Sequence, residues 1–249
     1  MANISYQLYC SRNFGPLDAT CKMLADAGYS AVEGYGGLFA DVDALKAALD
    51  GAGLAMPTSH IGLDLIIGDP DRTIEIAKTL GIGAVYAPFV GGVDRPTDEA
   101  GWSSFWAKLA EAAKPLRDAG IDVGWHNHDF EFQPLSSGAM PMELLDSAEV
   151  SIELDLGWVK RAGQDPVQWI QRLGPKLSAA HIKDLAPEGE NADEDGWADV
   201  GHGTFDWSST HAALKAAGVA RYVIEHDNPS DDARFAQRSL AGINAVIGA

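Results

Sequence analysis

Short apolar segments recur along the chain, and a stretch with apolar residues at helical spacing separates each one from the next. Segments of four to eight apolar residues bounded by turn residues predict buried strands. Between them, apolar residues spaced three or four positions apart predict amphipathic helices. We expect strands at 4–10, 31–36, 56–63, 84–89, 122–128, 152–155, 177–184 and 220–227. We expect helices at 16–27, 41–49, 70–80, 99–119, from about 165, at 206–217 and at 231–247.

The boundaries of these elements carry their own signals. Asp69 and Pro70 are suited to the N-cap and first position of the helix at 70–80, and Gly81 is suited to its C-terminal end. Gly28 likewise ends the helix at 16–27. Strict alternation of strand and helix over 249 residues favours a single (β/α)8 TIM barrel, with one domain over 1–249. A doubly wound open sheet is the alternative, because alternation alone does not prove closure.

Polar residues with ligand or acid–base chemistry lie where the predicted strands end. Parallel strands place their carboxyl ends on one side of the sheet, and barrel active sites are built there. Asp155 and His181 close two consecutive strands, so we expect them to face one cavity, and His126 and His128 share one face of their strand. The full set of candidates is Glu33, His60, His126, Asn127, His128, Asp155, His181, Lys183, Glu225 and Asp227.

Asp155, His181 and Glu225 are the strongest metal-ligand candidates, because a charged side chain inside a barrel is costly unless it is paired or coordinated. A structural ion network is the alternative. Glu33 could instead pair with a lysine on the rim, and His60 could be a core histidine. A thiolate-free set of carboxylates and imidazoles favours one divalent ion, with manganese or magnesium ahead of cobalt and zinc.

Composition narrows the classes of partner and compartment. The 36 acidic and 18 basic residues give a net charge of −18, which disfavours a nucleic-acid partner. No apolar stretch is long enough for a membrane helix, and the two cysteines form no disulfide framework. We expect a soluble, cytoplasmic protein. The acidity favours an unphosphorylated substrate.

Other segments have weaker signals. The polar stretch 186–203 is predicted to be a functional loop without core residues, with Gly201 and Gly203 as flexible glycines beside the site. Gly201-His202-Gly203 lacks the strand and third glycine of a dinucleotide fingerprint. Trp158 is expected to wall the pocket and stack on a sugar ring, whereas Trp106 and Trp169 are expected to pack helices on the barrel.

Four segments together resemble the xylose isomerase-like TIM-barrel superfamily of sugar phosphate isomerases and epimerases. They are VGWHNHDFEF, IELDLGWVKRAGQDPVQWIQRLGPKLSAAHIKD, VGHGTFDW and YVIEHD. The resemblance extends over nearly the whole chain. It implies a divalent ion, often manganese, held by Glu, Asp, His and Glu at the ends of strands five to eight.

Carried over to this chain, the resemblance assigns Asp155, His181 and Glu225 as metal ligands. At strand five His126 stands where many relatives have glutamate, and Glu131 is the alternative fourth ligand. The resemblance implies an isomerase or epimerase acting on a keto-sugar or keto-polyol through an enediolate, with a dehydratase or keto-glycoside lyase as the alternative.

The implied roles follow from this chemistry. Glu225 and either Glu131 or His128 would move protons, and Lys183 would stabilise the developing oxyanion. Dimers or tetramers are common in the superfamily, so a homo-oligomer is compatible with the resemblance. An abasic-site endonuclease and a non-catalytic sugar-binding subunit are the remaining alternatives. The residues expected to contact the carbohydrate are Glu33, His60, Asn127, Trp158 and Asp227.

Overall fold

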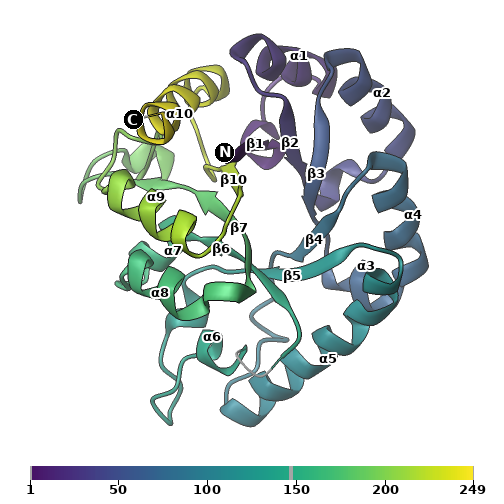
Figure 1. Cartoon of the computed structure of the whole chain (residues 1–249), viewed down its shortest axis with the longest axis vertical. Coiled ribbons are helices and arrows are strands. Elements are labelled where there is room, and N and C mark those ends of the chain that lie inside the picture. The colour runs from purple at the N-terminus through teal and green to yellow at the C-terminus, as the bar shows by residue number, and fades with distance from the viewer. Residues whose placement is uncertain (1, 146–147, 249) are drawn as a thin grey trace.

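Eight parallel strands close into a barrel in the computed structural model, which describes residues 2–145 and 148–248 (Figure 1). The first strand pairs with the second on one side and with the last on the other, so the sheet has no edge. This confirms the predicted TIM barrel and excludes the open sheet. The barrel strands are β1 (Asn3–Gln7), β2 (Ala31–Gly34), β3 (Ala55–His60), β4 (Ala84–Ala87), β5 (Asp122–His126), β6 (Ser151–Asp155), β7 (Leu177–Ile182) and β10 (Arg221–Ile224).

The helices form a ring outside the strands (Figure 1). Their amphipathic faces pack on the barrel, and several caps match the sequence signals: the Asp69 carboxylate accepts from the Arg72 amide at 3.1 Å, and Gly81 ends that helix with φ of 75°. The helices are α1 (Leu17–Ala27), α2 (Val42–Ala52), α3 (Leu63–Gly68), α4 (Pro70–Leu80), α5 (Glu99–Asp118), α6 (Pro141–Leu144), α7 (Leu156–Arg161), α8 (Pro166–Leu173), α9 (Trp207–Ala216) and α10 (Asp232–Ile247).

Several strands end earlier than the apolar segments predicted. The side chain of Gln7 accepts a hydrogen bond from the Tyr9 amide at 3.1 Å, which starts a 3-10 turn at Leu8–Ser11. The third strand ends at His60, and α3 begins shortly after it. The predicted strands therefore stop beneath the rim, and short helical segments build the mouth of the barrel.

The segment 186–203 is packed into the structure, which corrects the prediction that it lacks core residues. A two-stranded antiparallel sheet of β8 (Asp184–Leu185) and β9 (Trp197–Ala198) anchors it, and Trp197 and Val200 are fully buried. The Asp184 carboxylate accepts hydrogen bonds from the Gly201 amide and the Trp207 indole at 2.9 and 2.8 Å. The segment 186–203 is therefore held in place by hydrogen bonds and by buried side chains.

Gly203 has a packing role instead of the flexibility predicted for it. Its amide donates to Asp184 at 3.2 Å, and a Cβ at this position would lie 2.2 Å from the Asp184 carboxylate. Close approach of the backbone therefore requires glycine here. The predicted packing of Trp106 is confirmed, since its ring lies 5.1 Å from that of Trp125 on β5. No helix in the described ranges has the length and apolar composition needed to cross a membrane.

Candidate metal centre and active site

Asp155, His181 and Glu225 converge at the C-terminal end of the barrel, and we call them the upper cluster. They come from β6, from β7 and from the residue after β10. His181 Nδ1 lies 3.7 Å from Asp155 Oδ2 and 3.9 Å from Glu225 Oε2. His126 Nε2, from the end of β5, lies 4.0 Å from the same Asp155 oxygen. The structure therefore brings together the four side chains that the resemblance indicated.

The local fold holds Asp155 rigidly. Its Oδ1 accepts from the Trp158 amide at 2.8 Å and caps α7. Asn127, which we expected to contact substrate, instead bridges two strands: its Oδ1 accepts from the Asp155 amide at 2.9 Å, and its Nδ2 donates to the Asp155 carbonyl at 3.2 Å. Asp155 Oδ2, in contrast, has no hydrogen-bond partner in the described residues and faces the upper cluster.

The upper cluster fits a divalent cation. Asp155 Oδ2 and His181 Nδ1 are buried and have no hydrogen-bond partner in the described residues, and the buried Glu225 Oε2 is paired with the Lys183 ammonium at 2.7 Å. A buried polar atom without a partner is costly. Metal–ligand bonds of about 2.0–2.2 Å place two ligands of one ion roughly 3–4 Å apart, as observed here. The chemistry of the donors, two carboxylates and one or two imidazoles, suits manganese, cobalt, zinc or magnesium.

Lys183 lies beside the same carboxylates. Its ammonium is 2.7 Å from Glu225 Oε2 and 3.8 Å from Asp155 Oδ2, and it donates to Asp227. Its stem packs on Gly157, where a Cβ would lie 2.8 Å from Cγ of the lysine. Burial lowers the lysine pKa, but the three carboxylates outweigh burial and raise it. Lys183 is therefore a permanent cation beside the cluster.

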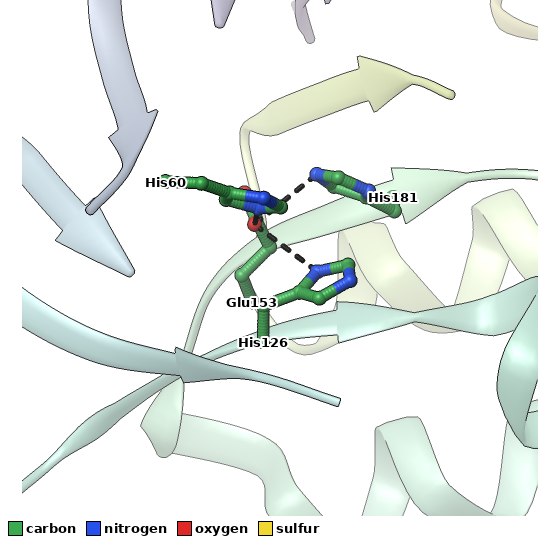
Figure 2. Close-up of side chains that lie close together, drawn as sticks. All are labelled: His60, His126, Glu153 and His181. Atoms are coloured by element: carbon green, nitrogen blue, oxygen red, sulfur yellow. Dashed lines mark hydrogen bonds and ion pairs between the residues drawn. The ribbon is translucent and has the colours of Figure 1, made fainter. Parts of the chain in front are cut away.

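A second group lies one layer deeper and consists of His60, His126, Glu153 and His181, which we call the lower cluster (Figure 2). One ligand atom from each of these buried side chains lies within 4.8 Å of the others. The cluster surrounds Glu153, which our sequence analysis missed. The available signal was the period of two along β6, which points Glu153 to the same face as Asp155.

Glu33 and His60 belong to this deeper layer. Glu33 Oε1 accepts from Gln7 at 2.8 Å and lies 2.8 Å from His181 Nε2. His60 Nε2 lies 2.7 Å from Glu153 Oε2. Glu33 is fully buried. Its ion-pair partners are the imidazoles of His60 and His181, and not the rim lysine that the sequence left open as an alternative. Burial and the neighbouring Glu153 raise the pKa of Glu33.

A cavity of about 350 Å³ opens above the clusters. His128 and Asp227 lie on its polar side, whereas Tyr9 and Phe89, which sequence reasoning missed, are 38% and 49% exposed. Burial, and then Lys183, lower the pKa of His128 to about 3, so its imidazole is neutral at pH 7. The residues that line the cavity are Gln7, Tyr9, His60, Pro88, Phe89, His126, His128, Glu225 and Asp227.

Glu131 lies away from these clusters, behind β5. Its two oxygens accept from the Trp125 indole and the His128 amide at 2.8 and 2.9 Å. The Trp125 ring faces Phe105 and Trp106 of α5, outside the barrel. Burial raises the pKa of Glu131 to about 8. This environment favours a structural role for Glu131 over the fourth-ligand or acid–base roles that remained open from the sequence.

Glu131→Gln is therefore expected to lower stability and leave metal affinity unchanged. The amide group presents an N–H to one of the two N–H donors, so one buried hydrogen bond is lost at a cost of about 1–3 kcal/mol. Thermal unfolding would measure this as a melting temperature lower by roughly 2–12 °C for a chain of this size. A metal dissociation constant that rises tenfold or more would assign Glu131 to the metal site instead.

Comparison with known proteins connects this geometry to a family. The chain is 26% identical over 194 residues to an inosose dehydratase from Geobacillus kaustophilus, a match that covers 68% of this chain and 62% of that protein. The chain thus spans less than two thirds of the length of this relative.

Solved structures share the fold. A sugar phosphate isomerase/epimerase from Parabacteroides distasonis superposes with a TM-score of 0.79 at 20% identity, over 97% of this chain and 93% of that one. The IolI protein with a bound zinc atom superposes with a TM-score of 0.75 at 16% identity, over 100% and 98% of the two chains. The profile of the xylose isomerase-like TIM barrel family matches residues 21–244, so the chain belongs to that family.

Proposed function

We propose that this protein is a divalent-metal-dependent isomerase or epimerase of an unphosphorylated keto-sugar or keto-polyol. The observation that carries the proposal is the upper cluster, in which three buried ligand atoms lie within 4.8 Å of one another and two of them, on Asp155 and His181, have no hydrogen-bond partner in the described residues. The ligands would be His126, Asp155, His181 and Glu225. The structurally similar IolI protein was solved with a bound zinc atom, which supports a metal in this protein.

A divalent ion bound there would polarise a substrate carbonyl and its neighbouring hydroxyl, which acidifies the intervening C–H. The side chains around the cavity would then handle the proton. His128 lines the cavity and has an Nδ1 without a hydrogen-bond partner in the described residues, so it is placed to accept a proton, although its lowered pKa makes it a weak base in the metal-free protein. Lys183, which is buried behind Glu225 and Asp227, would stabilise negative charge on the substrate oxygen through its electrostatic field.

Glu225 supplies a second proton-transfer group from another strand. It follows β10, whereas His128 follows β5, and the strand order places β7 and β6 between them. Groups on two sides of a substrate suit epimerisation, in which the proton leaves one face and returns to the other. Return of the proton to the adjacent carbon would give isomerisation.

The cavity wall indicates the class of substrate. No lysine or arginine is among the described residues that line the cavity, and the Glu225 carboxylate adds negative charge to it. These features oppose a phosphorylated sugar. Tyr9 and Phe89 present aromatic surface on which the apolar face of a sugar ring can stack. The ring of Trp158, which was expected to stack on the sugar, has its centroid 5.3 Å from that of the His128 ring and 4.9 Å from the Lys183 ammonium.

A dehydratase is the second candidate, and the similarity to an inosose dehydratase favours it. In that reaction the same base would remove the proton, and Asp227 would protonate a departing hydroxyl. Burial, and then Glu225, raise the pKa of the Asp227 carboxyl, as a general acid requires. Asp227 also lines the cavity.

Hydrogen exchange tests both candidates. Metal-loaded protein and chelator-stripped protein would be incubated in heavy water with unphosphorylated ketoses and inososes and followed by NMR. We expect metal-dependent deuteration next to the carbonyl, accompanied by a rearranged sugar for an isomerase or epimerase and by an unsaturated ketone for a dehydratase. Full metal occupancy without exchange or turnover on any of these substrates would contradict the proposal and favour a sugar-binding role.

A further inference from the structure

His126 and His181 each present their two ring nitrogens to two different environments. His181 Nδ1 faces the upper cluster and has no hydrogen-bond partner in the described residues, whereas its Nε2 faces the lower cluster. His126 has the opposite orientation: Nε2 lies near Asp155, and Nδ1 lies 3.3 Å from Glu153. Which nitrogen carries the proton therefore decides which cluster can bind a cation.

The distances place the protons in the lower cluster. His181 Nε2 is 2.8 Å from Glu33 Oε1 and 3.1 Å from Glu153 Oε2, both within hydrogen-bonding reach. Its Nδ1 is at least 3.7 Å from the upper carboxylates, too far to share a proton with them. A metal-bound imidazole keeps one N–H, so a proton at Nε2 leaves the lone pair at Nδ1 for the ion.

Glu153 connects the three imidazoles of the lower cluster. Its Oε2 lies 2.7 Å from His60 Nε2, 3.1 Å from His181 Nε2 and 3.3 Å from His126 Nδ1, and Figure 2 shows the three rings around this carboxylate. His126 Nδ1 makes no hydrogen bond in the described part of the chain, and Glu153 Oε2, 3.3 Å away, is an acceptor within reach of it. A carboxylate carries no proton of its own to donate, so all three contacts require N–H groups on the rings.

We infer that Glu153, assisted by Glu33, is a positioning residue that fixes the tautomers of His126 and His181 so that their unprotonated nitrogens face the upper cluster. The lower cluster is then a support for the metal centre and does not itself bind the ion. Carboxylates that accept the second N–H of a metal-bound histidine orient the ring and raise its basicity. Here one carboxylate serves two such rings. The inference rests on the proposed metal site.

NMR of the wild-type protein tests this assignment directly. With ¹⁵N-labelled histidine and zinc as the probe ion, long-range ¹H–¹⁵N spectra distinguish N–H, metal-bound and free ring nitrogens. We expect His126 with the proton on Nδ1 and zinc on Nε2, and His181 with the proton on Nε2 and zinc on Nδ1. The reverse pattern in both rings would place zinc in the lower cluster and overturn the inference.

A substitution gives the second readout. Glu153→Gln keeps the size of the side chain but removes the negative charge shared by the three imidazoles, so the N–H groups that face it are held less strongly and the tautomers of His126 and His181 are no longer fixed. We expect zinc affinity, measured by competition with a chromophoric chelator, to fall about 10–100-fold, together with altered histidine spectra. Glu131→Gln, an equally buried glutamate, is the matched control. Unchanged affinity and spectra in Glu153→Gln would contradict the inference.

The outcomes separate this inference from the proposed function. A wild-type protein that binds no zinc would overturn the metal site and with it both proposals. Zinc bound with the reverse tautomers would overturn only the positioning role of Glu153. Zinc bound with the expected tautomers, but without hydrogen exchange on any sugar, would overturn only the proposed reaction.

Discussion

Asp155→Asn is expected to lose near-stoichiometric metal and with it nearly all turnover. Asparagine retains the cap of α7, because its Oδ1 can still accept from the Trp158 amide and asparagine caps helices as well as aspartate does. It removes the anionic oxygen that points to the upper cluster. Loss of several kcal/mol of charge stabilisation corresponds to a fall in turnover of about 10²–10⁴-fold.

Metal content of purified wild type and variant, measured by elemental mass spectrometry, checks this result. Asp199→Asn is the control, because Asp199 is also a buried aspartate but pairs with Arg234 and Arg238 instead of facing the upper cluster. We expect the control to keep its metal. If Asp155→Asn retained as much metal as wild type, Asp155 would not be a ligand, and the metal-dependent mechanism would need a different site.

Lys183→Met is expected to destabilise the metal-free protein strongly and to slow turnover. Methionine preserves the stem against Gly157 but removes the ammonium that neutralises Asp155, Glu225 and Asp227. Unpaired buried charges cost about 3–5 kcal/mol, which corresponds to a melting temperature lower by roughly 6–20 °C. Loss of the group that stabilises the oxyanion lowers kcat by about 10²–10³-fold.

Adding a divalent cation distinguishes this explanation from simple loss of packing. The ion binds the same carboxylates, so it should restore more of the melting temperature in Lys183→Met than it adds to wild type. Lys78→Met, at an exposed position on α4, should change neither stability nor turnover. A destabilised Lys183→Met that metal does not rescue would indicate that the lysine contributes through its packing.

The barrel and the upper cluster could be predicted from sequence because each depends on local patterns. Alternating apolar segments specify strands and helices. A charged residue at the end of a buried strand is energetically unfavourable unless it is paired or binds a metal. Asp155, His181 and Glu225 follow from this reasoning without knowledge of which strands are neighbours. The parallel strand direction then brings their side chains to one end.

The lower cluster could not be predicted in the same way. Glu153 meets His60 through the barrel interior, 93 residues away in sequence, and such contacts depend on strand register. The register of β6 against β7 shifts between Ile152 and Glu153, so counting along the strands does not align them. Glu131 was predicted near the site because it follows β5, but the 3-10 turn Phe130–Phe132 directs it behind the strand.

The closure of the barrel has a consequence for the order in which the protein assembles. The upper cluster draws on β6, β7 and the residue after β10, His126 beside it ends β5, and the supporting residues Glu33 and His60 belong to β2 and β3. These strands adopt their final positions only when β1 pairs with β10, the first strand with the last. A bound ion would then act after the slow, non-local steps of folding. It would retard unfolding without accelerating folding, so the kinetic lifetime of the native state would depend on the metal supply.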